Sequence, residues 1–302
     1  MKIGRRQLLT GALAATLAPA LERAAPGPGD TRIIPSTGEA VPAVGLGTWI
    51  TFNVGRDPAL LDRSADVMAA FFDEGGGMID SSPMYGSAQQ TVGYGLQKLG
   101  HQTPVFAADK VWTTSVEGGP SQMEEARRNW GVQRFDLMQV HNLVAWEGHL
   151  DTLLRMKDEG RIRHVGITTS HGRRHGEMER IMARHPIDFV QLTYNVADRE
   201  AEDRLLPLAQ EKGIAVIANR PFQRGALLRR LQGEPLPPVA GELDARDWSE
   251  VVLKFILSHP ALTVAIPATT SAAHVRQNKR AVRGPMPDAA MRGEIARHVD
   301  AL

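Results

Sequence analysis

Short apolar runs alternate with longer amphipathic segments over most of this chain. The runs are rich in β-branched residues and nearly continuous in hydrophobicity, which is typical of strands buried on both faces. They predict eight strands, at Val44–Gly47, Met78–Asp80, Val105–Ala108, Leu137–His141, Val165–Thr169, Phe189–Tyr194, Ile214–Ala218 and Thr263–Ile266.

Each apolar run is followed by a segment with helical periodicity. These segments predict helices at Pro58–Glu74, Ala88–Leu99, Ser121–Asn129, Glu147–Glu159, Arg173–Arg184, Glu200–Glu211, Asp247–Ser258 and Ser271–Val282. Regular alternation of strand and helix predicts a parallel sheet covered by helices. Eight such units favour an α/β fold of the (β/α)8 TIM-barrel type, with residues 31–302 as one domain.

A β-hairpin is expected before the first barrel strand. Thr31 to Ile34 would form its first arm, Pro35 to Gly38 its turn, and the second arm begins at Val41. The alternative fold is a doubly wound open sheet. The absence of Gly-x-Gly-x-x-Gly after any predicted strand favours the barrel.

Residues 1–30 differ in character from the rest of the chain. Arg5 and Arg6 precede an apolar run from Leu8 to Leu21, and small residues follow it. This order is typical of an export signal peptide, and the paired arginines favour the twin-arginine type. We therefore expect export machinery to bind this segment and deliver the protein to the periplasm or beyond. The run is too short to cross a bilayer, so no stable membrane anchor is expected.

Composition and charge narrow the possible partners. The 302 residues include 35 Lys and Arg, 34 Asp and Glu, and no Cys. Balanced charge disfavours a nucleic-acid partner held by bulk positive charge. Without cysteine the chain has no disulfide, no thiolate nucleophile and no Cys-ligated zinc, and no metal site is expected from other residues.

Three neighbouring predicted strands end in side chains that carry chemistry. The second strand ends at Asp80 with Tyr85 shortly after it, the third is followed by Lys110, and the fourth ends at His141. Each residue alone has an ordinary structural explanation. Because active sites of such barrels lie at the carboxyl ends of the strands, the four are expected to share one rim.

These four groups suit proton transfer to a carbonyl oxygen. A tyrosine with a pKa near 10 is a weak acid at neutral pH, and a nearby ammonium lowers that pKa. Lys110 would supply this field, Asp80 would keep Lys110 charged, and His141 would hydrogen-bond the same substrate oxygen. The set predicts a general acid, Tyr85, working beside a hydride-donating cofactor.

The chain resembles the aldo-keto reductase family over about Thr31 to Val282. The resemblance is carried by Gly45-Leu46-Gly47-Thr48-Trp49, Gly76 to Gly86, Asp109-Lys110-Val111-Trp112, Gln139-Val140-His141-Asn142, Val190 to Asn195, and Ile266-Pro267 followed by Asn278. It implies a (β/α)8 barrel, a nicotinamide cofactor lying extended across the rim, and a catalytic tetrad of Asp80, Tyr85, Lys110 and His141. Histidine at 141 implies reduction of aldehyde or ketone carbonyls, or oxidation of the corresponding alcohols.

The resemblance also assigns residues to the cofactor. They are Thr48, Trp49, Asn142, Thr168, Thr169, Gln191, Asn219, Arg220, Pro221, Phe222, Gln223, Gly225, Leu227, Ile266, Ala268, Thr269, Thr270, Ser271, His274, Gln277 and Asn278. Thr168 and Thr169 stand where the family has Ser-Asn, and Asn219 stands where it often has a ring-stacking Tyr.

The choice between NADP and NAD rests on the last of these residues along the chain, from Ala268 onward. Thr269, Thr270 and Ser271 open a helix, whose N-terminus attracts phosphate. Ala268 and His274 stand where the family typically has Lys and Arg, so the usual grip on a 2′-phosphate is weakened. NADP is expected from the family's general habit, with NAD as the alternative.

The substrate is expected to be a small carbonyl compound in an apolar pocket. Trp49, Met84 and Trp112 are the expected lining, and the long segment from Arg220 to Arg246 and the tail beyond Arg283 are expected to shape specificity. Two alternatives remain. One is a barrel hydrolase that uses Asp80 with a second acid or a metal, and the other is a non-catalytic nicotinamide- or ligand-binding barrel in the periplasm.

Overall fold

The computed structural model describes residues 30–100 and 105–302. The predicted export signal lies outside these residues, apart from Asp30. In the described part, β1 (Thr31–Ile33) and β2 (Ala40–Pro42) pair antiparallel, with Thr31 opposite Pro42. This is the hairpin that the sequence predicts.

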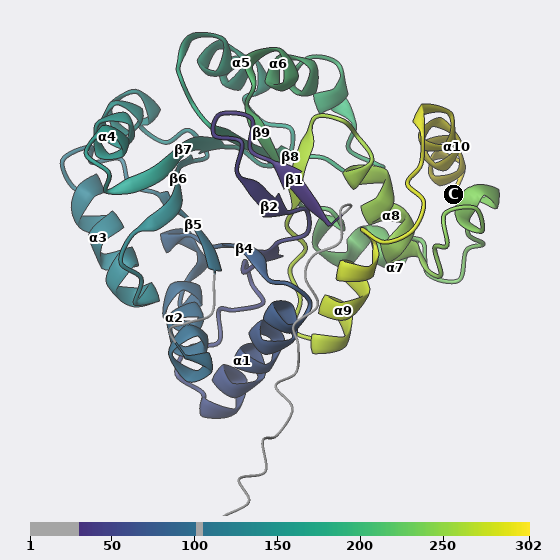
Figure 1. Cartoon of the computed structure of the whole chain (residues 1–302), viewed down its shortest axis with the longest axis horizontal. Helices are drawn as coiled ribbons and strands as arrows, with labels where there is room; N and C mark the ends of the chain where they lie inside the picture. The colour runs from purple at the N-terminus through teal and green to yellow at the C-terminus, as the bar shows by residue number, and fades with distance from the viewer. Residues whose placement is uncertain (1–29, 101–104) are drawn as a thin grey trace, which may run out of the picture.

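Eight parallel strands form the centre of the molecule (Figure 1). They are β3 (Leu46–Gly47), β4 (Gly77–Asp80), β5 (Val105–Val111), β6 (Phe135–His141), β7 (Ile162–Thr168), β8 (Phe189–Thr193), β9 (Ala215–Asn219) and β10 (Leu262–Ala265). They lie side by side in chain order. Parallel bridges from Val44 to Ala265 and from Gly47 to Ala268 join the two edge strands. The sheet therefore curls round on itself as in a (β/α)8 barrel, and the doubly wound alternative is wrong.

The helices surround the strands (Figure 1). Those that follow successive barrel strands are α1 (Pro58–Asp73), α2 (Ala88–Leu99), α3 (Gly119–Trp130), α4 (Trp146–Asp158), α5 (His175–Arg184), α6 (Leu205–Lys212), α8 (Trp248–Leu257) and α9 (Ala272–Arg280). Each overlaps a predicted helix, and the bounds of α2 are those that the sequence predicts. Glu200–Glu211 instead divides into a 3-10 turn, η2 (Glu200–Glu202), and the shorter α6.

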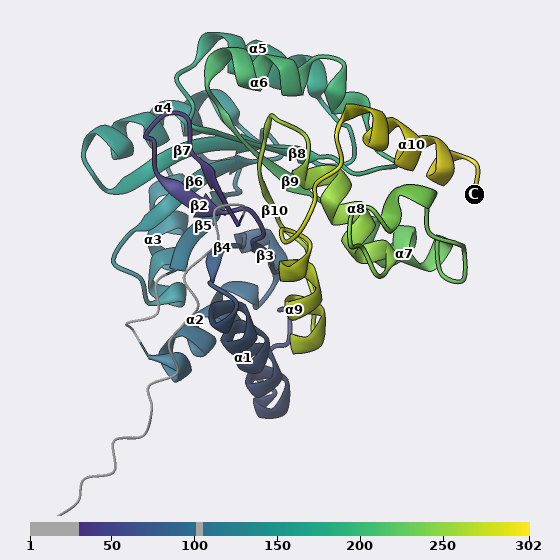
Figure 2. The same cartoon turned by 45° about the vertical axis from the view of Figure 1, so that its right-hand side comes forward.

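Two helices were not anticipated by periodicity. The first, α7 (Ala226–Arg230), lies within the segment expected to be irregular, together with the 3-10 turns η3 (Gln223–Gly225) and η4 (Pro238–Ala240). The second, α10 (Ala289–Asp300), packs against α8 and η4 (Figure 2). No residue of α10 lines the large cavity described below. The tail therefore does not shape the site directly, contrary to expectation.

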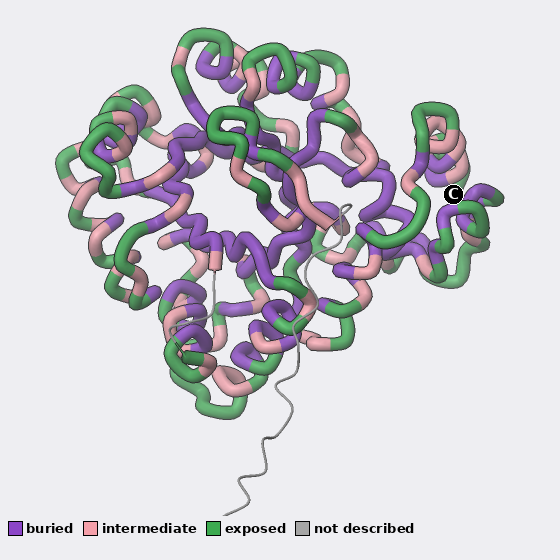
Figure 3. The backbone as a smooth tube through the Cα atoms, in the orientation of Figure 1, coloured by how far each residue is buried: buried purple, intermediate pink, exposed green. Residues whose placement is uncertain are grey.

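Apolar side chains fill two layers, one inside the ring of strands and one between the strands and the helices. In Figure 3 the backbone of the central strands is buried over most of its length. The inner layer includes Met78, Phe106 and Phe189, and the hairpin adds Ile34 and Val41 to it. The hairpin thus covers the amino-terminal end of the barrel. The carboxyl ends of the strands remain the open end, where function is expected in this architecture. No helix in residues 30–100 or 105–302 is long and apolar enough to cross a membrane.

A tight helix contact supports the strands that carry the site. A Cβ built on Gly93 of α2 would lie 1.9 Å from the backbone oxygen of Asn129 in α3. Gly93→Ala should therefore force these helices apart and lower the free energy of unfolding by roughly 1–3 kcal/mol. Gly176→Ala is the control, because a Cβ at Gly176 in α5 meets only a side-chain atom of Arg180 at 3.9 Å. Urea unfolding of both variants tests this, and equal stability of the two would contradict it.

Candidate active site

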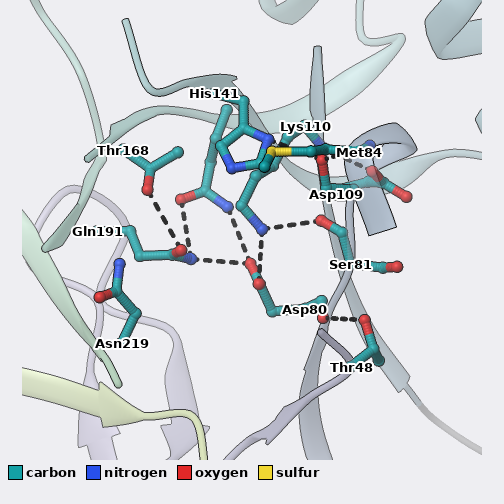
Figure 4. A network of polar contacts seen from close by, with 12 residues as sticks. Thr48, Asp80, Ser81, Met84, Asp109, Lys110, His141, Thr168, Gln191 and Asn219 are labelled. Atoms are coloured by element: carbon teal, nitrogen blue, oxygen red, sulfur yellow. Dashed lines mark hydrogen bonds and ion pairs between the residues drawn. The ribbon is translucent and has the colours of Figure 1, made fainter. Parts of the chain in front are cut away.

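The carboxyl ends of neighbouring strands bring polar side chains to one rim, as Figure 4 shows. Because side chains alternate across a strand, every second residue points into the barrel. The residues delivered in this way are Asp80 from β4, Lys110 from β5, Gln139 and His141 from β6, Thr168 from β7, and Gln191 from β8. The fold therefore brings together three of the four predicted tetrad members by strand register alone.

A buried ion pair forms the floor of this site. Lys110 Nζ lies 2.6 Å from Asp80 Oδ2 and donates a second hydrogen bond to the backbone oxygen of Ser81 at 2.8 Å. The two side chains are only 0% and 2% exposed. Burial alone would lower the pKa of Lys110, but Asp80 and the other nearby acidic groups raise it above its usual value. Lys110 is therefore held charged, as predicted from the sequence.

Two glutamine amides complete the bonding of Asp80. Gln191 Nε2 donates to Asp80 Oδ1 at 2.8 Å and Gln139 Nε2 at 3.2 Å. Since a carboxylate only accepts, both amides must present their NH2 groups to it. Thr168 Oγ1 donates to Gln191 Oε1 at 3.2 Å. One lone pair of Gln191 Oε1 is left for a ligand in the cavity. The sequence drew attention to Gln139 only as part of a motif and predicted no role for it.

Tyr85 stands on the 3-10 turn η1 (Pro83–Tyr85), directly after β4. Lys110 Nζ is 5.1 Å from the centre of its ring. Burial raises the pKa of Tyr85 to about 12, although the charge of Lys110 acts in the opposite direction. The expected lowering of this pKa is therefore wrong, because desolvation of the phenolate outweighs the ammonium field. The phenol stays protonated across the physiological range.

His141 faces the same space and is held by a residue that the sequence did not single out. Ser82 Oγ lies 2.7 Å from His141 Nδ1 and also accepts a hydrogen bond from the backbone N–H of Met84. Burial, with a contribution from Lys110, lowers the pKa of His141 to about 2, so the imidazole is neutral. When the Ser82 hydroxyl donates to Nδ1, the ring proton is on Nε2, free for a ligand. The local sequence signal for Ser82 is a serine directly before Pro-x-Tyr, where it caps a 3-10 turn.

A cavity of about 1200 Å³ opens above these groups. It is lined by the tetrad members Asp80, Tyr85 and His141, while Lys110 lies beneath. The predicted cofactor residues that line it are Thr48, Trp49, Asn142, Thr168, Thr169, Gln191, Asn219, Arg220, Pro221, Phe222, Gly225, Ile266, Ala268, Thr269, Thr270, His274, Gln277 and Asn278. Of the expected substrate-pocket residues, Trp49 and Met84 line it.

Besides Lys110, four predicted site residues do not line this cavity. Gln223 donates to Asp198 Oδ2, Leu227 is part of the apolar core, and Ser271 caps α9 by accepting from the backbone N–H of His274. Trp112 is 40% exposed, with its ring centre 6.5 Å from that of His141. These residues shape the loops around the site rather than its wall.

One end of the cavity carries amide and hydroxyl groups. Asn219 Nδ2 donates to the backbone oxygen of Thr169, and its Oδ1 accepts from Thr193 Oγ1. The amide of Asn219 is thus fixed as a flat surface at the position where a stacking Tyr is usual. Thr169 Oγ1 points to Met178 Sδ of α5, so Thr168 is the member of the Thr pair whose hydroxyl belongs to the site.

The opposite end meets the N-terminus of α9. Ala268, Thr269, Thr270 and His274 line it, and Thr269 Oγ1 lies 3.2 Å from His274 Nδ1. Two of the basic residues farther along α9 are engaged elsewhere, and a third, Arg276, is exposed and does not line the cavity. Lys279 Nζ donates to the backbone oxygen of Gly76, and Arg280 pairs with Glu250. The helix N-terminus and His274 are the features at this end that favour an anion.

Two arginines face the middle of the cavity. The guanidinium carbon of Arg224 lies 3.8 Å from the centre of the Trp49 ring, which is itself 6.1 Å from that of Tyr85. Arg220 donates to His171 Nε2. Neither arginine forms an ion pair with a carboxylate of the described residues, and burial with the nearby Arg224 lowers the pKa of Arg220. Unpaired cations in a cavity favour an anionic ligand, and Arg224 was not among the predicted site residues.

Comparisons with known proteins agree with this geometry. Residues 43–293 match the model of the Aldo/keto reductase family. The chain is 26% identical over 247 residues to methylglyoxal reductase YeaE of Escherichia coli, covering 79% of this chain and 84% of that protein. It is 27% identical over 222 residues to aldo-keto reductase YhdN of Bacillus subtilis, covering 67% and 64%.

Solved structures show the same fold. A crystal structure of an aldo/keto reductase from Klebsiella pneumoniae in complex with NADP and acetate superposes with a TM-score of 0.75. It is 24% identical and covers 89% of this chain and 95% of that one. A glycerol dehydrogenase from Gluconobacter oxydans, 19% identical, also gives a TM-score of 0.75 and covers 91% and 95%. With the family match spanning most of the described residues, this chain belongs to the aldo/keto reductase family.

Proposed function

We propose that this oxidoreductase reduces the carbonyl group of small aldehydes or ketones with NADPH, and that Tyr85 is the proton donor. The observation that carries the proposal is the buried Lys110–Asp80 ion pair beneath Tyr85 and His141. It lies at the floor of a cavity large enough for a dinucleotide and a substrate together, since about 1200 Å³ exceeds the usual range of small-ligand pockets.

The residues along the cavity fit a nicotinamide cofactor. Gln191 offers an acceptor to a carboxamide, Arg220 and Arg224 are unpaired cations for a diphosphate, and the N-terminus of α9 beside His274 suits a 2′-phosphate. The Klebsiella protein with this fold was crystallised with NADP, which supports the same choice here. When bound, the reduced cofactor supplies the hydride that the carbonyl carbon receives.

Proton transfer is the part of the reaction that this chain's residues perform. A carbonyl oxygen placed between Tyr85 and His141 accepts hydrogen bonds from the phenol and from His141 Nε2. As negative charge develops on that oxygen, Tyr85 gives up its proton. Lys110 stabilises the resulting phenolate, and Asp80 keeps the ammonium in position. The neutral state of His141 matters, because it leaves Tyr85 as the acid.

The mouth of the site suits a small or partly apolar substrate. Trp49 and Met84 line the cavity beside Tyr85, and Trp112 stands next to His141. The relative named methylglyoxal reductase supports a small carbonyl compound as substrate. The hydrolase alternative is not supported, because Asp80 is fully engaged by Lys110, Gln139 and Gln191. The alternative of a non-catalytic binding barrel is not favoured either, because all four residues expected for proton transfer are present.

Removing the phenol hydroxyl tests the role of Tyr85. Tyr85→Phe should lower kcat for aldehyde reduction by about 10²- to 10⁴-fold, while the Kd for NADPH changes little. Tyr94→Phe is the matched control, since that phenol contacts Asp62 on the surface of α2 and α1. Steady-state kinetics and calorimetric titration measure the two quantities. Wild-type turnover in Tyr85→Phe would remove Tyr85 from the mechanism.

Cofactor choice is tested by direct binding. NADPH should bind about tenfold more tightly than NADH at low salt, because only NADPH presents a second phosphate to the α9 N-terminus and His274. This difference should shrink as salt is added, since the end of the cavity is open to solvent. Titration of the chain from Thr31 onward, at two salt concentrations, measures both effects. Equal affinity for the two cofactors would contradict the NADP assignment.

A further inference from the structure

A second buried carboxylate lies on the strand that carries Lys110. Asp109 immediately precedes Lys110 on β5 and is 0% exposed. Successive side chains of a strand point to opposite faces. Lys110 points into the barrel toward Asp80, whereas Asp109 points outward to Gln89 of α2 and Trp130 of α3. The reaction proposed above makes no use of this group.

Hydrogen-bond donors from three elements surround the Asp109 carboxylate. Gln89 Nε2 of α2 lies 3.1 and 3.0 Å from its two oxygens, and Trp130 Nε1 of α3 donates to Oδ2 at 2.7 Å. The backbone N–H of Lys110 donates to Oδ1 at 2.7 Å. Every one of these partners is neutral. Such bonds stabilise a buried carboxylate but leave its negative charge uncompensated.

The charged groups close to Asp109 are those of the site itself. Lys110 is the nearest cation, and its ammonium is already bonded to Asp80 and to the Ser81 carbonyl. The ammonium is therefore paired with Asp80 inside the barrel, while the charge of Asp109 acts on it from the outer face of the same strand. Gln89 and Trp130, which α2 and α3 place against Asp109, carry no charge. A change in the charge of Asp109 thus reaches Lys110 and Tyr85 through a dry interior, where screening is weak.

We propose that Asp109 is a positioning residue that sets the proton affinity of the Tyr85–Lys110 pair through its negative charge, while its hydrogen bonds fix β5 against α2 and α3. The inference rests on the proposed function of Tyr85 as proton donor. When ionised, Asp109 holds Lys110 charged and makes Tyr85 a weaker acid. When Asp109 is protonated, Tyr85 gives up its phenol proton more readily.

The pKa shifts of Asp109, Tyr85 and Lys110 support this electrostatic coupling. Burial raises the pKa of Asp109 to about 7, against the opposing effect of its hydrogen bonds and of Lys110. Asp109 in turn raises the pKa of Tyr85 and of Lys110. The carboxylate would therefore change its charge within the physiological range and carry that change to the proton donor.

The direction of the effect on activity follows from the charge. Reduction needs the neutral phenol, so its rate falls where Tyr85 loses its proton at high pH. Without the negative charge at position 109 the phenolate is easier to form, and this fall should begin at lower pH. Alcohol oxidation needs the phenolate, so its alkaline rise should move to lower pH as well.

Asp109→Asn tests the proposal, because the amide keeps the shape and an acceptor but removes the charge. The alkaline limb of kcat/KM for reduction should move down by about one pH unit. The wild-type profile should also bend near pH 7, where Asp109 changes its charge, and this bend should be absent in Asp109→Asn. Trp130→Phe is the second variant. It removes a donor and keeps the charge, so it should move the inflection near pH 7 upward and leave the alkaline limb in place.

Asp188→Asn is the matched control. Asp188 is also buried and accepts from Lys157 and the backbone N–H of Val165, but it contacts none of the site residues. It should lower stability and leave the pH profile unchanged. A pH profile of Asp109→Asn equal to that of wild type, with the fold intact by circular dichroism, would overturn the proposal. So would an equal shift in Asp188→Asn.

A readout without turnover separates this inference from the proposed function. The chain has only three tyrosines, so the ring carbon of Tyr85 can be identified by NMR in protein labelled with ¹³C-tyrosine. Onset of Tyr85 ionisation should occur about one pH unit lower in Asp109→Asn than in wild type. An unshifted onset defeats the role of Asp109 even if the enzyme is active. A shifted onset in a protein that reduces no carbonyl would support Asp109 and defeat the proposed function.

Discussion

The site depends on one buried ion pair, Lys110 with Asp80. Two charges with almost no exposure are stable only if their remaining hydrogen-bonding capacity is met. Here the Ser81 carbonyl binds Lys110, and the amides of Gln139 and Gln191 bind Asp80. The ion pair and the two amides come from four strands, β4, β5, β6 and β8, and Ser81 directly follows β4. Any change in strand register would leave a buried charge unpaired, so the geometry of the barrel and the chemistry of the site stabilise each other.

The ion pair also helps to explain the protonation states of the neighbouring groups. Its ammonium disfavours a proton on His141, which is neutral, and it stabilises the phenolate form of Tyr85. Burial works against the phenolate and keeps the Tyr85 phenol protonated, as the proposed role of proton donor requires. Gln191 connects the same pair to the cavity that it lines, because its amide nitrogen donates to Asp80 while its amide oxygen accepts from Thr168. In the proposed mechanism, cofactor binding and proton donation therefore share one network.

Much of this arrangement could be predicted from the sequence. The strands and the tetrad positions followed from short apolar runs that end in polar residues, because parallel strands bring their carboxyl ends to one rim. The direction of the Tyr85 pKa shift could not be predicted, since it depends on the balance between burial and a charge. Ser82 and Arg224 were missed because their roles arise from contacts across loops, with His141 and Trp49. Leu227 was misplaced because a short helix, α7, turns it into the core.

Transfer of a labelled hydride would test the central claim most directly. The chain from Thr31 onward is mixed with NADPH carrying deuterium at the transferable C4 position, and with a panel of small aldehydes and ketones. The account predicts that at least one product alcohol gains one deuterium on the former carbonyl carbon, as measured by mass spectrometry. Saturable binding of NADPH with no labelled alcohol from any member of the panel would contradict it.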